Sequence, residues 1–199
     1  MNTYHKSLIK RIIILFVTIW LISIPLHTHA ASDQTVIRKQ VNTLLKACKK
    51  YDLAKIRSCT GGAKILYTSD KTFIRLIKKG NNKYFSADIQ KIKVSKDKAT
   101  VYLNVTELSG WNVSISAISE YSDYLDRSPK ALKNAIKKYY YYAITDPQEG
   151  DIVTYKCKLT YVKNNGKWVV KPDKKLYELM DGGLCTLLLD FAKNPKKYL

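Results

Sequence analysis

The stretch "YVKNNGKWVVKPDKKLYELM", residues 161–180, reads as a strand, a tight turn, a second strand and a helix. Asn165 and Gly166 are the residue types that adopt the positive φ angles of a tight hairpin turn. Pro172 ends the returning strand because it has no N–H to donate to the ladder, and Asp173 is a good N-cap for the next helix. The sequence therefore predicts an antiparallel ribbon that continues directly into an amphipathic helix.

The first strand of this ribbon and two segments before it have the two-residue period of β-strands. Residues 151–162 alternate, with one side formed by Val153, Tyr155, Cys157, Leu159 and Tyr161. Residues 84–94 and 99–108 predict a second hairpin around the turn "SKDK". In its first strand, the alternation of apolar and polar residues shifts by one position between Ile89 and Ile92. This shift predicts a β-bulge near Gln90-Lys91.

Helical periodicity dominates before the first hairpin. A helix capped by Ser32 or Asp33 has an apolar face made of Ile37, Val41, Leu44, Leu45 and Cys48. Asp52 caps a short helix that ends at Gly61-Gly62, and a third helix runs from about Asp70 to Gly80.

Helical periodicity returns between the two hairpins and at the end of the chain. Residues 111–145 are predicted to be helical, with Ser128-Pro129 starting a helix whose buried face includes Leu132, Ile136 and Tyr139. The part over 111–127 is equally compatible with a continued strand. Gly182-Gly183 separates the helix after Asp173 from a last helix over 184–192. We expect an α+β fold, with helices packed on a curved antiparallel sheet and a C-terminal helix.

The N-terminus has the pattern of a secretory signal peptide. Lys6, Lys10 and Arg11 precede an apolar run over 12–24, and Ala30 ends a plausible cleavage site. We expect residues 1–30 to be removed and residues 31–199 to form one domain that is secreted or associated with the cell wall. An uncleaved segment that anchors the chain in a membrane is the alternative.

Cleavage would remove all three histidines, His5, His27 and His29. The exported part would then have no imidazole, which is the usual general base near neutral pH and the commonest metal ligand. We expect no cofactor, no metal and no enzymatic activity.

The exported part is strongly basic because 32 Lys and Arg would remain against 16 Asp and Glu, a net charge of +16. Nearly all of the excess is Lys, whereas proteins that recognise the bases and phosphates of nucleic acids favour Arg. We therefore expect the binding partner to be an anionic wall polymer, a small ligand or a peptide, and we do not expect it to be a nucleic acid.

Four cysteines form an even set in an oxidising compartment, and disulfides Cys48–Cys59 and Cys157–Cys185 are the favoured pairing, with free buried thiols as the alternative. Aromatic residues supply the candidates for a pocket wall: Tyr102, Tyr139, Tyr155, Tyr161 and Trp168. Asp88 and Glu107 are the most inward carboxylate candidates, and both fit the solvent side or a strand end equally well.

Three segments, "VNTLLKACKKYDLAKIRSC" (41–59), "KIKVSKDKATVYLNVTEL" (91–108) and "YKCKLTYVKNNGKWVVKPD" (155–173), resemble exported NTF2-like domains of low-GC Gram-positive bacteria, several families of which have no assigned function. The resemblance covers most of residues 33–180 and implies a cone-shaped α+β roll around a pocket. It carries over no catalytic residue. Many such domains are lipoproteins, and this chain lacks the lipidated Cys that they use.

These observations favour a non-enzymatic binding or accessory domain that holds a small ligand, a peptide or an anionic cell-envelope polymer. The alternative function is a His-free enzyme of the cone fold that uses Asp/Tyr acid–base chemistry.

The signal peptide generates the first testable prediction. We expect the secreted protein to begin at Ala31, and intact-mass measurement of protein from the culture medium would check this. A full-length chain that stays in the membrane fraction would contradict cleavage.

Overall fold

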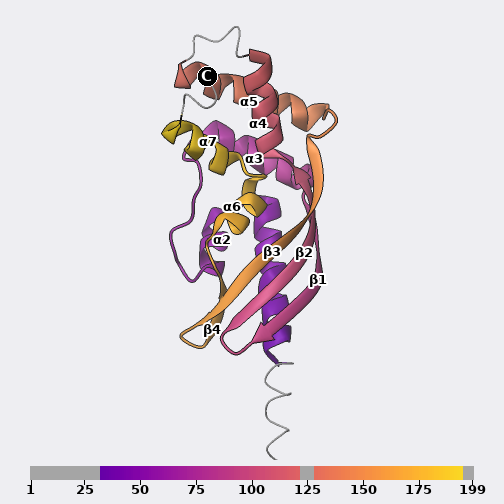
Figure 1. The fold of residues 1–199 in the computed structure, drawn as a ribbon, viewed down its shortest axis with the longest axis vertical. Coiled ribbons are helices and arrows are strands. Elements are labelled where there is room, and N and C mark those ends of the chain that lie inside the picture. Colours follow the sequence, from indigo (N-terminus) through magenta and orange to yellow (C-terminus); the bar gives the residue numbers. More distant parts are fainter. Residues whose placement is uncertain (1–31, 122–127, 195–199) are drawn as a thin grey trace, which may run out of the picture.

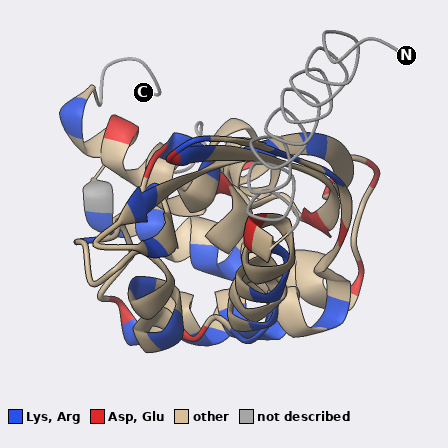
Figure 2. Ribbon diagram, turned by 90° about the horizontal axis from the view of Figure 1, so that it is seen from below, with Lys and Arg blue, Asp and Glu red and all other residues tan. Residues whose placement is uncertain are grey.

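The computed structural model describes residues 32–121 and 128–194, so the predicted signal segment lies outside the described residues. The fold is α+β, as expected, with a four-stranded antiparallel sheet in the order β1-β2-β3-β4. The sheet forms one outer layer and the helices lie against its other face and beyond one end (Figures 1 and 2).

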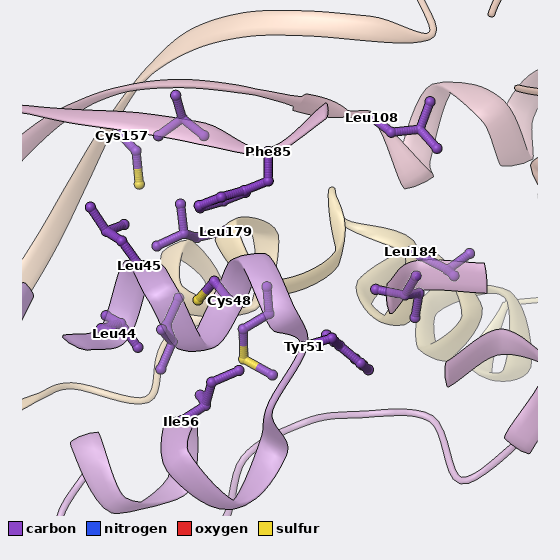
Figure 3. Packing of buried hydrophobic residues seen from close by; sticks show 14 of the residues in the cluster. Leu44, Leu45, Cys48, Tyr51, Ile56, Phe85, Leu108, Cys157, Leu179 and Leu184 are labelled. Atoms are coloured by element: carbon purple, nitrogen blue, oxygen red, sulfur yellow. The ribbon is translucent and has the colours of Figure 1, made fainter. Parts of the chain in front are cut away.

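The N-terminal helices form as their periodicity predicts. The first covers residues 32–50, and its five predicted apolar residues are all buried. The second, α2 (Leu53–Cys59), is capped by Asp52, whose carboxylate accepts a hydrogen bond from the Lys55 N–H. Both helices pack into the core shown in Figure 3.

Helix α3 (Lys71–Tyr84) begins where predicted but ends later. Asp70 caps it by accepting from the N–H groups of Thr72 and Phe73. The prediction that Gly80 ends the helix is wrong. Gly80 lies buried within α3, where an added Cβ would come within 3.1 Å of Leu108 Cδ2, so this glycine permits close packing instead of a turn.

The sheet consists of β1 (Ser86–Ser95), β2 (Lys98–Leu108), β3 (Ile152–Asn164) and β4 (Lys167–Val170). The predicted bulge in β1 is confirmed by a shift of register between Ile89 and Lys91. The predicted hairpin turn is confirmed as well, because Asn165 and Gly166 have φ angles of 48° and 75°.

Two helices are inserted between β2 and β3, namely α4 (Gly110–Tyr121) and α5 (Pro129–Thr145). The ambiguous region is therefore helical over 110–121, and 122–127 lies outside the described residues. The predicted cap of α5 is confirmed, since the Ala131 N–H donates to Ser128 Oγ at 3.2 Å.

The chain closes with α6 (Lys174–Asp181), capped by Asp173, and α7 (Leu184–Lys193). A buried amide connects these helices to the earlier ones. Asn81 Nδ2 on α3 donates to the carbonyl oxygens of Cys48 and Met180, both at 2.8 Å. One continuous cluster of buried apolar residues extends from Ile37 to Phe191.

The two faces of the sheet differ in composition. On β2, Val101, Leu103 and Val105 face the helices and are buried, whereas Tyr102 and Asn104 point to the opposite face. Within 32–121 and 128–194, none of the helices has the length and apolar character needed to cross a bilayer.

The turn between α6 and α7 packs backbone against backbone on the end of β2. The Trp111 N–H donates to the Gly182 carbonyl at 2.9 Å. Gly182 has a φ of +62°, and a Cβ there would lie 2.3 Å from the Leu108 carbonyl oxygen and 2.5 Å from the Gly110 nitrogen. A side chain at this position would collide with backbone atoms that have little freedom to move.

We expect Gly182→Ala to lower the free energy of unfolding by about 3 kcal/mol or more, measured by urea denaturation. Gly62→Ala is the matched control, because Gly62 also has a positive φ (+87°) but nothing lies within 4 Å of its added Cβ. Its loss should be about 1 kcal/mol, the cost of the backbone conformation alone. Equal losses would show that the close contact contributes nothing.

Candidate functional site

Two cavities lie near the C-terminal helices. The larger, which we call the apolar cavity, has a volume of about 490 Å³ and lies between the segment before α3, the start of α5, and α7. Its wall is mainly apolar and is formed by Leu66, Phe73, Leu132, Leu188, Leu189 and Phe191. Its volume falls in the usual range for small-molecule pockets.

The rim of the apolar cavity is polar and charged. Asp70 Oδ2 lies 2.6 Å from Lys137 Nζ, and this contact, with the N–H bonds at the start of α3, lowers the pKa of Asp70. Lys133 also lines the cavity, is exposed, and has no ion pair among the described residues. The rim therefore carries one uncompensated positive charge.

The second cavity, which we call the carboxyl cavity, has a volume of about 380 Å³. It lies between the end of β2, the start of β3, α4, α6 and the α6–α7 turn, and its lining includes Glu107, Tyr155, Glu178 and Trp111. Tyr155 O–H donates to Glu107 Oε1 at 2.7 Å, which places a tyrosine beside a buried acid.

Glu107 is only 2% exposed, and its second oxygen, Oε2, is buried with no hydrogen-bond partner among the described residues. Burial raises its pKa well above the ordinary 4.5, and the hydrogen bond from Tyr155 only partly opposes this shift. Burial, together with the nearby Glu107, also raises the pKa of Tyr155. Burial therefore favours the neutral carboxylic acid form of Glu107 over the carboxylate.

A second buried acid, Asp181, is the last residue of α6 and lies next to the start of α7. Burial raises its pKa to about 6, opposed by hydrogen bonds from the Cys185 thiol and from backbone N–H groups that include Gly183, 3.1 Å from Oδ1. Tyr51 lies beside Cys185, and the pKa of the Cys185 thiol is raised by burial and by Asp181. Asp181 Oδ2 and the Tyr51 hydroxyl oxygen are both buried without a hydrogen-bond partner among the described residues.

All four cysteines are thiols in the structure, and neither expected disulfide is formed. Cys157 lies on the inner face of the sheet, near Leu45 of the first helix (Figure 3), whereas Cys185 bonds to Asp181. Burial raises the pKa of Cys48 and Cys157 and suppresses their thiolates. A nucleophilic role for these buried thiols is not favoured.

Of the five aromatic residues predicted to line a pocket, Tyr155 lines the carboxyl cavity. Tyr161 and Trp168 belong to the core, and Trp168 Nε1 donates to Asp33 Oδ1 at 2.9 Å. Tyr139 is half-buried on α5, where Tyr140 is the fully buried tyrosine. Tyr102 lies on the face of the sheet that points away from the helices.

The acidic residues of the described ranges do not cluster into a metal site. Of the two carboxylates left open between the inside and the solvent side, Glu107 is buried and Asp88 is exposed on β1. Asp151 is buried at the start of β3 and accepts a hydrogen bond from the Gln148 N–H. Across 32–121 and 128–194, no three Cys, Asp or Glu side chains are grouped so that they could hold a metal ion.

Sequence reasoning missed the apolar cavity, because its wall comes from three segments that are far apart in the chain. One signal was present in α7. Its apolar residues occupy more than one side of the helix, which exceeds what a single core-facing stripe requires. Half-buried Leu188 and exposed Leu189 are the residues that extend the stripe into the cavity.

Comparison of the chain with protein-family models, with curated proteins and with solved structures finds no match.

The buried Glu107 generates a prediction on pH and stability. In the unfolded chain Glu107 ionises above about pH 4.5, but the folded protein keeps the proton, so stability falls as the pH rises. Glu107→Gln cannot ionise. Between pH 5 and 7, we expect wild type to lose about 1.4 kcal/mol per pH unit more than this variant, measured by urea unfolding.

Glu120→Gln is the control, since Glu120 is exposed on α4 and its variant should follow the wild-type pH dependence. Asp181 is present in all three proteins, and its charge adds to the raised pKa of Glu107. Parallel curves for wild type and Glu107→Gln would mean that Glu107 is ionised in the folded protein.

Proposed function

We propose that the protein is an exported, non-enzymatic binding domain that holds a small, mostly apolar ligand in the apolar cavity. The observation that supports this most strongly is a 490 Å³ cavity lined mainly by leucine and phenylalanine side chains. Partly exposed apolar residues around such a space gain free energy when a ligand removes them from water, by about 25 cal/mol for each Å² buried.

The charges at the rim narrow the class of ligand. Asp70 is neutralised by Lys137, whereas Lys133 has no ion pair within the part of the chain that the structure describes. A ligand with a hydrocarbon part and an anionic end would place its chain against Leu188 and Leu189 and its charge near the Lys133 ammonium. A fatty carboxylate is the simplest molecule with this chemistry.

The Glu107–Tyr155 contact favours the second candidate function, a His-free enzyme. Two features make binding the better proposal. The Tyr155 hydroxyl proton is already donated to Glu107, and Glu107 Oε2 has no contact with solvent, so neither group is directed at a substrate. Burial also raises the pKa of Glu107 and so disfavours the carboxylate form that a general base requires.

The resemblance to NTF2-like domains remains part of the proposal. In that family a bent sheet wraps around a pocket, whereas here the inner face of β2 carries packed core side chains such as Val101 and Leu103. Both cavities lie beyond this packed region, among the helices and the strand ends. A position outside the cytoplasmic membrane rests on the predicted signal peptide and on the excess of lysine.

The apolar cavity can be tested by making its wall charged. We expect wild type to bind a dansyl-labelled undecanoic acid with increased fluorescence, and Leu189→Glu to weaken this binding by about tenfold or more. Leu189 is 40% exposed, so the substitution does not bury a charge in the unliganded protein.

Ile115→Glu is the matched control. Ile115 is 37% exposed on α4, outside the residues that line the apolar cavity, and should bind the probe as wild type does. The proposal fails if wild type does not bind the probe, or if both variants lose binding to the same extent.

A further inference from the structure

The solvent face of β1, β2 and β3 carries a concentration of lysines. The register of the strands gives the residues that share the face opposite the buried Val101 and Leu103, which we call the outer face. Its exposed lysines are Lys91, Lys93, Lys98, Lys156 and Lys158. The acidic residue of these strands on the same face is Asp88, so the outer face has a large positive excess.

These lysines lack acidic partners. The ion pairs of the described residues involve Lys137, Lys163, Lys174 and Lys175, all of which lie outside this group. Figure 2 shows basic segments on the sheet and on the helices, and fewer acidic ones. Like charges on neighbouring strands repel each other, and an anionic partner would relieve this repulsion.

Tyr102 lies at the centre of the outer face. The register places it between Lys91 on β1 and Lys158 on β3. The Nζ atoms of Lys93 and Lys158 lie 5.7 Å and 5.5 Å from the centroid of its ring. The ring therefore holds two ammonium groups by cation–π contact, and it is not a free platform for stacking a nucleic-acid base.

The middle of the outer face is otherwise polar, and its apolar residues Ile152 and Val162 lie at the two ends of β3. Thr100, Asn104 and Thr160 share it, and Thr106 Oγ1 lies 2.8 Å from Thr154 Oγ1. Surfaces that bind bilayers combine basic residues with large apolar ones that enter the lipid. The centre of this face has no such anchor among its described residues, which favours a water-soluble partner.

We propose that the outer face binds a linear polyanion that is not a nucleic acid and that has a phosphodiester or phosphate group in each repeat. Lysines two residues apart on a strand are about 6.8 Å from each other, so a single extended chain can meet successive ammonium groups. Lysine recognises such a chain through charge rather than through bidentate geometry. This surface is separate from the apolar cavity, so it does not depend on the function proposed for that cavity.

Long-chain inorganic polyphosphate is the test probe, with its affinity measured over a series of salt concentrations. The sheet variant carries Lys91→Gln, Lys93→Gln and Lys158→Gln. We expect its affinity at low salt to fall by about tenfold or more. Its slope of log affinity against log salt should decrease by about 2, at about 0.7 for each lost contact.

The control variant carries Lys39→Gln, Lys46→Gln and Lys49→Gln on the exposed side of the first helix, and it has the same net charge. Its affinity should stay within about twofold of wild type. Equal losses in the two variants would overturn the proposal, because they would show diffuse attraction without a defined surface.

Two further measurements distinguish the proposed polymer from a membrane and from a nucleic acid. Phosphatidylglycerol vesicles and a thymidine oligonucleotide should each bind wild type more weakly than polyphosphate at equal phosphate concentration. Tighter binding of either, lost in the sheet variant, would overturn the proposal in favour of a membrane or a nucleic acid. Both variants should bind the dansyl-labelled undecanoic acid as wild type does, so a failure of the cavity proposal is recognised separately.

Discussion

The close contact between the end of β2 and the α6–α7 turn positions α7 relative to the sheet, and with it one wall of each cavity. Gly110 and Gly182 allow the two backbones to meet, and the hydrogen bond from the Trp111 N–H to the Gly182 carbonyl fixes their relative position. Glu107 lies on one side of this contact, in the wall of the carboxyl cavity, and α7 leaves it on the other side to line the apolar cavity. Side chains at either glycine would separate β2 from α7, and both cavities would change shape. The arrangement therefore depends on the absence of two Cβ atoms more than on any single attractive interaction.

Buried polar groups determine what chemistry the core allows. Asn81 is used structurally, because its amide joins the ends of the first helix and α6 to α3. Asp181 is held by the N–H groups at the start of α7, and burial favours the neutral form of Glu107 beside Tyr155. In each case the polar group interacts with the protein itself and is not presented to a substrate. Because the described residues contain no histidine, no imidazole replaces these groups near neutral pH. The interior is consistent with a scaffold that supports binding at its surface cavities.

Local signals predicted most of the fold, and long-range packing explains what they missed. Asp52, Ser128 and Asp173 each cap a helix as predicted, because a cap depends only on the next few residues. The predicted end of α3 at Gly80 is wrong, because a glycine that ends a helix and a glycine that makes room for a neighbouring side chain look the same in sequence. Parity along β3 predicted that Tyr155 and Tyr161 share a face, but only tertiary structure decides that one meets a cavity and the other the core. The apolar cavity could not be located from the sequence, because no local pattern connects Leu66, Leu132 and Leu189.

The distribution of charge separates the two proposed binding surfaces. The apolar cavity lies among α3, α5 and α7, whereas the lysines of the outer face lie on strands whose other face is covered by the core (Figure 1). A polyanion held on the sheet would therefore leave the cavity accessible to its ligand. Lysine suits this role better than arginine, because hydrated ammonium groups form contacts that salt weakens and that exchange readily along a repeating chain. Such contacts would retain the protein near an anionic polymer without fixing its orientation, while the specific recognition remains with the cavity.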